Sequence, residues 1–180
     1  MSPLLVRAVG VVVCCCAALA AAAPANDAGE VNRLFESGQT SEAFDRLERL
    51  IEADPRDPQL RFQKGVMLAE TGRSADAQRV FTELTVDFPE IPEPYNNLAV
   101  IHAARGEYDR ARALLETALR ASPNYSTAHE NLGDIHLQLA RLSYAQALRL
   151  DPSNTTIAPK LALLRQLIQS TAAAAPRTDP

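Results

Sequence analysis

Residues 95–123 read YNNLAVIHAARGEYDRARALLETALRASP and contain the clearest structural signal of the chain. Their landmarks recur along the chain with a fixed period of thirty-four positions, in three separate series: Pro55, Pro89 and Pro123; Gly38, Gly72 and Gly106; Ala43, Ala77 and Ala111. A repeat of this length that is rich in helix-forming residues is typical of two antiparallel helices per unit, with each unit covering the apolar face of its neighbour. The sequence therefore predicts an all-α array of stacked helix pairs. Such arrays present surfaces for binding, which favours a binding protein over an enzyme.

Within residues 95–123, the residue types fit the demands of a helical hairpin. Small residues such as Ala99 and Ala111 let two helices approach closely, because little side chain separates their backbones. Gly106 ends the first helix, and Pro123 stops the second because its ring cannot continue a helix. Each repeat is therefore expected to form one hairpin.

These residues, together with the aromatic, leucine and small residue in Tyr95-Asn96-Asn97-Leu98-Ala99, resemble the tetratricopeptide repeat family. The resemblance runs from about residue 26 to residue 152. It implies a right-handed α-solenoid of stacked helix-turn-helix repeats, in which the first helix of each pair lines a concave surface. Three full repeats are expected, followed by a fourth without its turn and by a C-terminal capping helix.

The predicted domain boundaries follow this register. Residues 1–25 are interpreted as a signal peptide and residues 26–169 as the repeat domain. Residues 170–180 are interpreted as a disordered tail, because they are rich in alanine and proline without periodicity. The repeats are expected at about 26–57, 58–91, 92–125 and 126–152, and the capping helix at 155–169.

The fourth repeat breaks the rhythm. Ala147 and Pro152 arrive five positions earlier than the period requires. The missing residues are those of the turn, since residues 137–142 contain no glycine, proline or asparagine and helix formers run unbroken from Ala128 to Leu150. We predict a single helix of about 35 Å at 1.5 Å per residue. The alternative is a strained, tight turn near Ala140.

A final helix is predicted after Pro152. Ser153 or Thr155 could cap it, and Pro159 is tolerated near its first turn. One apolar stripe is expected along it, formed by Ile157, Leu161, Leu164 and Ile168. We expect this helix to fold back on the long helix and cover apolar surface that the absent hairpin partner leaves bare.

Residues 1–25 match a secretory signal. Arg7 provides a positive head, residues 8–19 are an uncharged apolar run, and residues 20–25 are small. Cleavage is predicted before Ala23 or before Asn26. The alternative is an uncleaved anchor, although the apolar run falls just short of the ~20 residues that a bilayer core requires.

All three cysteines, Cys14, Cys15 and Cys16, lie inside this apolar run. Bacterial lipoprotein signals place a small residue before the modified cysteine, and Val13 does not fit that pattern. The mature chain would then contain no cysteine, which excludes disulfides and thiolate chemistry. The abundance of arginine and alanine hints at a bacterial source. We therefore predict a periplasmic or secreted protein that is not a lipoprotein.

Charge and motifs argue against several function classes. The net charge is −4 and no basic run exists, so the electrostatic footprint of a nucleic-acid-binding protein is missing. His102 and His136 occupy the seam position of Leu34 and Leu68, and His129 takes the place of Tyr95, so the histidines are interpreted as packing residues. No nucleophile–base set, metal-ligand spacing or phosphate loop is recognisable. We predict no catalytic residue, no metal site and no cofactor.

The resemblance places a groove for a partner along the first helices. Ten residues are predicted to line it: Gln59, Phe62, Gln63, Val66, Asn96, Asn97, Val100, Glu130, Asn131 and Asp134. Gln63, Asn97 and Asn131 follow one another at exactly one period, so their amides should form a ladder. A carboxamide can pair with a peptide backbone whatever the peptide's side chains are. The alternative is that these amides meet only water.

The charge of this groove indicates what a partner could carry. Some relatives in the family grip a terminal carboxylate with lysine and arginine, but no basic residue stands at the ten positions, so that mode is disfavoured. Glu130 and Asp134 lie one turn apart and favour a basic partner segment. The alternative is a solvated helix face.

The sequence thus predicts a non-enzymatic protein–protein interaction module, exported to the bacterial periplasm, that binds a peptide or protein in its concave groove during envelope assembly. The predictions include no nucleic acid and no membrane span after signal removal. A homo-oligomer remains as an alternative: a structural protein that pairs through its long fourth helix near Leu142, Tyr144 and Leu148.

Overall fold

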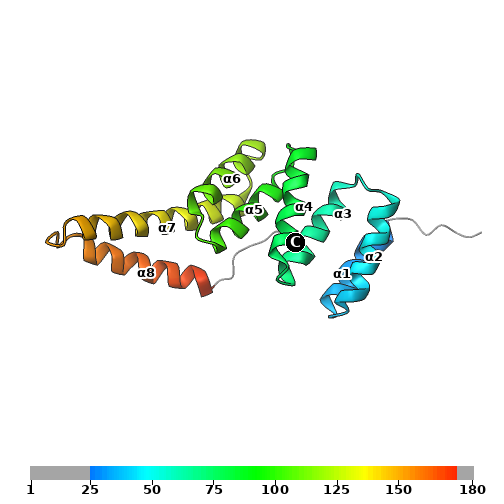
Figure 1. Cartoon of the computed structure of the whole chain (residues 1–180), viewed down its shortest axis with the longest axis horizontal. Coiled ribbons are helices and arrows are strands. Elements are labelled where there is room, and N and C mark those ends of the chain that lie inside the picture. Colours follow the sequence, from blue (N-terminus) through cyan, green and yellow to red (C-terminus); the bar gives the residue numbers. More distant parts are fainter. Residues whose placement is uncertain (1–24, 174–180) are drawn as a thin grey trace, which may run out of the picture.

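A computed structural model describes residues 25–173 of the chain, with side chains for residues 28–170. This part of the chain folds into eight α-helices without a strand (Figure 1). The helices are α1 (Ala25–Glu36), α2 (Thr40–Ala53), α3 (Pro58–Glu70), α4 (Ser74–Asp87), α5 (Glu93–Ala104), α6 (Tyr108–Ala121), α7 (Ser126–Leu150) and α8 (Ile157–Ala173). The predicted cleavage site before Ala23, the three cysteines and residues 174–180 of the predicted tail lie outside the described residues.

The first six helices form three hairpins that stack in chain order. Within each hairpin the helices pack against each other, and the second helix of one hairpin packs on the first helix of the next: α2 on α3, α4 on α5 and α6 on α7. Figure 1 shows the hairpins in a row, with the α7–α8 pair extending away from its end. The predicted all-α solenoid of stacked repeats is confirmed.

The three hairpin turns have the same geometry. Gly38, Gly72 and Gly106 have φ angles of 80°, 77° and 76°, a region that residues with a Cβ rarely adopt. At the third turn, Gly106 N–H donates to the carbonyl of Ala103 over 2.9 Å, and Glu107 N–H donates to that of His102 over 3.0 Å. These two hydrogen bonds give the last carbonyl groups of the helix their partners, and the helix ends there.

The fourth repeat lacks this turn because the five residues of the turn are missing, so that Ala140 stands where the period would place a glycine. An alanine disfavours a positive φ but is the best helix former, so the helix continues through it. As a result α7 runs for 25 residues without a break. The predicted long helix is confirmed, and the alternative of a tight turn near Ala140 is wrong.

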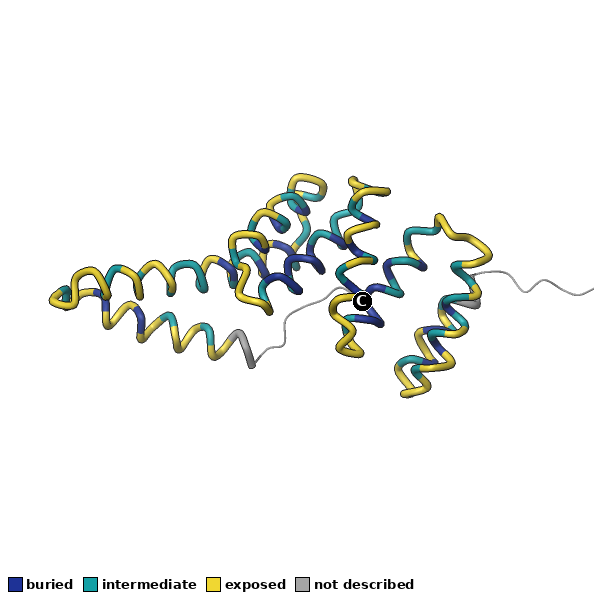
Figure 2. Tube along the Cα trace, viewed as in Figure 1, coloured by how far each residue is buried: buried dark blue, intermediate teal, exposed yellow. Residues whose placement is uncertain are grey.

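The core consists of three clusters that bridge successive helices. One joins α1, α2 and α3, the next joins α3, α4 and α5, and the third joins α5, α6 and α7. In each, a large, fully buried residue of the second helix stands at the same repeat position: Leu47, Phe81 and Leu115, again spaced by one period. Burying such a side chain stabilises the fold by about 1.5–3 kcal/mol. Figure 2 shows burial concentrated in the stacked hairpins and thinning along α7 and α8.

The last helix packs on α7 as predicted, with its apolar stripe turned inward. Ile157 and Leu161 are buried, and Leu164 and Ile168 are half-buried. The helix begins after the predicted caps, because its loop is held differently: the Ser153 hydroxyl donates to Asp151 over 2.6 Å.

The predicted tail needs a correction. Residues 170–173 belong to α8. The reason is that the alanines following Ser170 are strong helix formers, so they extend α8 beyond residue 169.

Candidate functional site: the concave helix face

The first helices of the repeats line hollows in the surface. One hollow of about 300 Å³ lies between α1 and α3. Half of its lining residues are apolar, and the other half are two glutamines, one asparagine and two glutamates: Ala28, Asn32, Phe35, Glu36, Gln59, Phe62, Gln63, Val66, Met67 and Glu70. We call it the N-terminal hollow.

A second hollow of about 160 Å³ lies between α5 and α7, with one wall residue from α6. Its lining is almost wholly apolar, apart from Asn131 and Asp134: Ala99, Val100, Ala103, Ala104, Leu115, Asn131, Asp134 and Ile135. We call it the C-terminal hollow. It is large enough for one apolar side chain of a partner.

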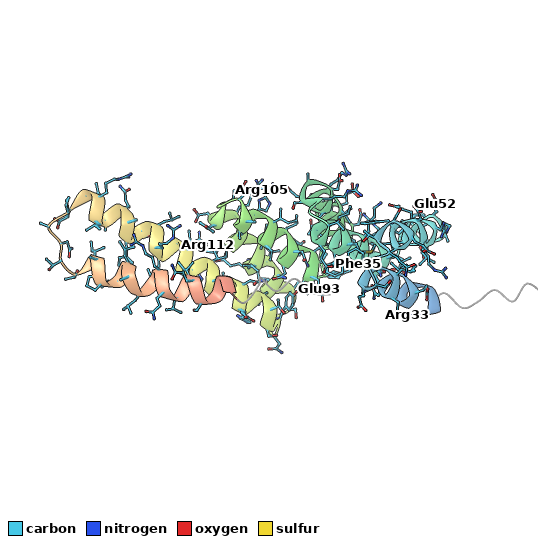
Figure 3. All side chains as sticks on the ribbon, turned by 90° about the horizontal axis from the view of Figure 1, so that it is seen from below. Arg33, Phe35, Glu52, Glu93, Arg105 and Arg112 are labelled. Atoms are coloured by element: carbon cyan, nitrogen blue, oxygen red, sulfur yellow. The ribbon has the colours of Figure 1, made fainter. Side chains whose placement is uncertain are left out.

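A third hollow of about 300 Å³ adjoins the N-terminal one, because Gln59 and Phe62 line both. It reaches the start of α5 through Glu93 and Pro94, and Tyr125 completes its wall. Phe35 in the N-terminal hollow and Glu93 in this middle hollow are labelled in Figure 3. The two hollows lie next to each other, one beside α1 and the other at the beginning of α5.

The lining follows the repeat register. Asn32, Val66, Val100 and Asp134 follow one another at one period, the first two in the N-terminal hollow and the last two in the C-terminal one. The series in sequence passes from polar through apolar to acidic. The concave face is therefore built by one repeated position, whose side chain changes character along the array.

The structure brings together seven of the ten predicted lining residues in the two named hollows. Gln59, Phe62, Gln63 and Val66 line the N-terminal hollow, and Val100, Asn131 and Asp134 line the C-terminal one. Glu130 is exposed on α7 and lines none of the three hollows described above, and Asn96 and Asn97 are buried.

The predicted amide ladder is wrong as a grip for peptide backbone. Asn97 is 2% exposed, and its Nδ2 donates to the carbonyl of Glu93 over 3.0 Å. Asn131 Nδ2 donates to Asn96 Oδ1 over 2.8 Å, which ties α7 to α5. Gln63 Nε2 donates to Asn32 Oδ1 over 2.6 Å. Gln63 and Asn131 thus bond to side chains of the preceding first helix, whereas Asn97 bonds within its own helix, so all three amide donors are already engaged inside the protein.

Sequence reasoning missed several lining residues, although a signal for them existed. Asn32 lies one period before Val66, and Ala104 lies one helical turn after Val100. Extending the series by one repeat and one turn would have found both. Ile135, by contrast, belongs to the core as well as to the C-terminal hollow, which periodicity alone does not reveal.

The charges around the hollows have one sign. Glu36 and Glu70 line the N-terminal hollow, Glu93 lines the middle one, and Asp134 lines the C-terminal one, while no lysine or arginine lines any of the three. Burial raises the pKa of Asp134, and the nearby Glu130 carboxylate raises it further. A raised carboxyl pKa means that the charged form lacks a compensating cation. The concave face thus favours cationic groups.

The histidines are divided between core and surface. His102 is buried as predicted, and its Nδ1 lies 2.7 Å from Glu107 Oε2 in the turn. This hydrogen bond lowers the pKa of Glu107. His129 and His136 are exposed, so their prediction as packing residues is wrong. The reason is that the helix that would cover them continues in line with α7.

Two further findings apply to residues 25–173. No group of three or more histidine, cysteine, aspartate or glutamate side chains is arranged to hold a metal ion within this part of the chain. None of the helices described is both long and apolar enough to cross a membrane.

Comparisons with known proteins agree with this architecture. The tetratricopeptide repeat family matches residues 29–90, 68–126 and 96–155. The human protein "Tetratricopeptide repeat protein 16" is 29% identical over 146 residues, which are 72% of this chain but only 17% of the human protein. The chain therefore spans about a sixth of the length of that relative.

Solved structures of low identity share the fold. TTC0263, a thermophilic protein from Thermus thermophilus, has a TM-score of 0.59 at 22% identity, covering 81% of this chain and 83% of that one. The first such domain of Spaghetti (RPAP3), bound to the HSP90 peptide SRMEEVD, has a TM-score of 0.57 at 22% identity, covering 64% of this chain and 94% of that one. The stacked hairpins and their concave face define an α-solenoid repeat protein. The chain belongs to the tetratricopeptide repeat family.

Proposed function

We propose that the protein is a non-enzymatic interaction module that binds an extended segment of a partner protein along its concave face. The observation that carries this proposal is the lining of the three hollows, which combines apolar walls with carboxylates and includes no cation. A partner segment with spaced apolar side chains and at least one lysine or arginine fits such a face. The apolar groups would provide affinity, and the charges would set orientation and selectivity.

The C-terminal hollow specifies one contact of this interaction. Its apolar wall of Val100, Leu115 and Ile135 accepts an aliphatic side chain, and the Asp134 carboxyl stands at the same hollow. A basic residue next to that aliphatic side chain would neutralise Asp134 and relieve the unfavourable burial of its charge. The N-terminal hollow offers a similar combination with Phe62 and Glu70.

The related RPAP3 domain was solved with the peptide SRMEEVD, which ends in acidic residues. That peptide would meet Glu36, Glu70 and Glu93 on the concave face of this chain. Like charges brought together in this way disfavour binding. We therefore propose the opposite charge preference for this protein.

A peptide titration tests the proposal. Two peptides of equal length that alternate leucine with arginine or leucine with glutamate are titrated by fluorescence anisotropy. The basic peptide should bind and the acidic one should not. Asp134→Lys should lower the affinity for the basic peptide by about tenfold, which corresponds to about 1.4 kcal/mol.

The matched control is Glu52→Lys, which makes the same charge change at an exposed position of α2 outside the three hollows. It should leave affinity within about twofold, because a remote surface charge is screened by salt. Equal losses of affinity in both variants, or equal affinity for the two peptides, would contradict the proposal that peptides bind on the concave face.

We further propose that the module works in the periplasm of a bacterium, in envelope assembly. The support is the N-terminal sequence, with Arg7 before an apolar run and small residues up to Ala25. Expression of the full chain in a Gram-negative host followed by N-terminal sequencing of the periplasmic fraction tests this. A mature start at Ala23 or Asn26 is expected, and an intact chain retained in the cytoplasm would rule the proposal out.

A further inference from the structure

The N-terminal half of α7 exposes a helix face that the second helix of the hairpin covers in every earlier repeat. In α5, Ala99 packs in the cluster shared with α6 and α7, and His102 is buried beside Glu107 of the turn to α6. Their counterparts one period later are Gly133 and His136. Both counterparts are exposed. This face of α7 has lost the second helix that would pack on it.

In the second and third repeats, one small and one large residue face each other between the two helices of the hairpin. In the second repeat, a Cβ built on Gly65 would lie only 2.4–2.9 Å from three atoms of the Phe81 ring. The absence of a side chain at Gly65 therefore leaves the space that the Phe81 ring occupies. In the third repeat, Ala99 and Leu115 hold the same positions, and both are at most 1% exposed.

The fourth repeat keeps both members of this pair but does not bring them together. Gly133 holds the small position, and nothing lies within 4 Å of a Cβ built on it. The large position lies eight residues before the terminal proline, as Phe81 and Leu115 do before Pro89 and Pro123. Eight residues before Pro152 stands Tyr144.

Gly133 and Tyr144 cannot meet within one chain, because both lie on the continuous helix α7. Their separation of eleven residues is about 16 Å along the axis and close to three full turns, so both point to the same side within about 20°. Two copies of α7 placed antiparallel, with a two-fold axis near Leu139, would set each Tyr144 over the Gly133 of the other copy. Such an interface is self-complementary and closed.

We propose that α7 is a homodimerisation helix: the Tyr144 ring of each copy packs over Gly133 of the other and replaces in trans the hairpin that the fourth repeat lacks. The partner approaches beside His136, on a side that α8 leaves exposed. Tyr144 is itself only half-buried in the single chain, with the Lys160 ammonium 5.3 Å from its ring centre. The concave hollows are not needed for this pairing, so it stands independently of peptide binding.

The decisive variant is Gly133→Leu, studied by light scattering and sedimentation on the protein as the expression host makes it. Open space surrounds Gly133 in the single chain, so the fold should be intact by circular dichroism. The wild type should form a concentration-dependent dimer, and Gly133→Leu should raise its dissociation constant at least about 100-fold, since an added side chain blocks the ring. Tyr144→Ala in the same chain should recover much of that loss by making room for the leucine.

A second variant tests the repeat logic. Inserting Gly-Glu-Tyr-Asp-Arg, the sequence of residues 106–110, between Leu139 and Ala140 restores the turn. The second half of α7 can then cover the first half in the same chain, and the protein should become monomeric. The matched control is the same insertion between Ser153 and Asn154, which lengthens an exposed loop and should leave the dimer.

Two results would overturn the proposal. One is a wild type that stays monomeric at about 1 mM, a concentration that reveals even weak association. The other is a dimer unchanged by both Gly133→Leu and the turn insertion, which would place any contact elsewhere, for example on the exposed Leu163 and Leu167 of α8.

Discussion

The third and fourth repeats begin with nearly the same first helix and end in different structures. Residue by residue, the helix that starts after Pro92 and the one that starts after Tyr125 share the seam pattern, yet one ends at Ala104 and the other runs on to Leu150. Only five residues, the counterparts of Gly106 and its four successors, separate the two outcomes. The turn, rather than the helices, therefore decides whether a repeat forms a hairpin. Four sets of substitutions test this conclusion.

The largest difference in stability is expected between alanine variants of the equivalent leucines Leu98 and Leu132. Leu98→Ala removes a side chain that is 5% exposed in the cluster that joins α3, α4 and α5, so the free energy of unfolding should fall by about 2–5 kcal/mol. Leu132→Ala changes the equivalent, half-buried residue and should cost about 1 kcal/mol. Urea unfolding of dilute protein followed by circular dichroism measures both. Equal losses would show that the fourth repeat is as well packed as the third.

Alanine substitution of the two equivalent glycines, Gly65 and Gly133, should change the stability in opposite directions. Gly65→Ala forces the Phe81 ring to move and should destabilise the fold by about 1–3 kcal/mol. Gly133→Ala meets no atom in its own chain and should stabilise dilute protein by up to about 1 kcal/mol through helix propensity. Thermal unfolding midpoints of the two variants provide the test. A destabilised Gly133→Ala at low concentration would mean that its surroundings are already filled.

A third comparison sets alanine at Gly106, in the turn of the third repeat, against glycine at Ala140, within the unbroken helix α7. Gly106→Ala places a Cβ at a φ of 76° and should cost about 1–2 kcal/mol. Ala140→Gly removes a good helix former from the middle of α7 and should cost about 1 kcal/mol. Both variants lose stability, but for opposite reasons. Helicity measured by circular dichroism should therefore fall with Ala140→Gly, and little change is expected with Gly106→Ala.

The smallest effect concerns Asp134, whose pKa is raised in the folded protein by burial. Because the folded pKa lies above the ordinary value of 3.8, the carboxylate costs stability at neutral pH and costs nothing when protonated. Asp134→Asn should stabilise the protein at pH 7 by no more than about 0.5 kcal/mol, since the group is partly solvated. The gain should vanish toward pH 3. Unfolding curves at both pH values check the sign, and a destabilised variant at pH 7 would refute it.

Much of the fold was predictable from the sequence, because turns and seams are local. The positive φ at Gly106 and the chain stop at Pro123 follow from the chemistry of single residues. The absence of such a residue between Leu137 and Leu142 was enough to predict the long helix. The start of α8 at Ile157 was less predictable, since the side chains of Asp151 and Asn154 hold the preceding loop.

The site was predicted only in part, because which face of a helix meets solvent depends on how far its neighbours stand away. Val100 and Asp134 were identified correctly as lining residues. Asn97, only three residues from Val100, is turned into the stack, and no repeat pattern distinguishes the two orientations. The histidine prediction failed for a different reason. A continuous α7 already implied that His129 and His136 lose their cover, but the packing role was inferred from Tyr95 and Leu68 alone.

The position of α8 at the end of the array has a consequence for motion. None of the three hydrophobic clusters that bridge the hairpins includes a residue of α8, and α8 packs mainly against α7. Local opening requires the least free energy where few apolar contacts must break. Backbone amide hydrogens of α8 should therefore exchange with deuterium before those of α3 or α5. The terminal helix can come loose and return while the rest of the solenoid stays intact.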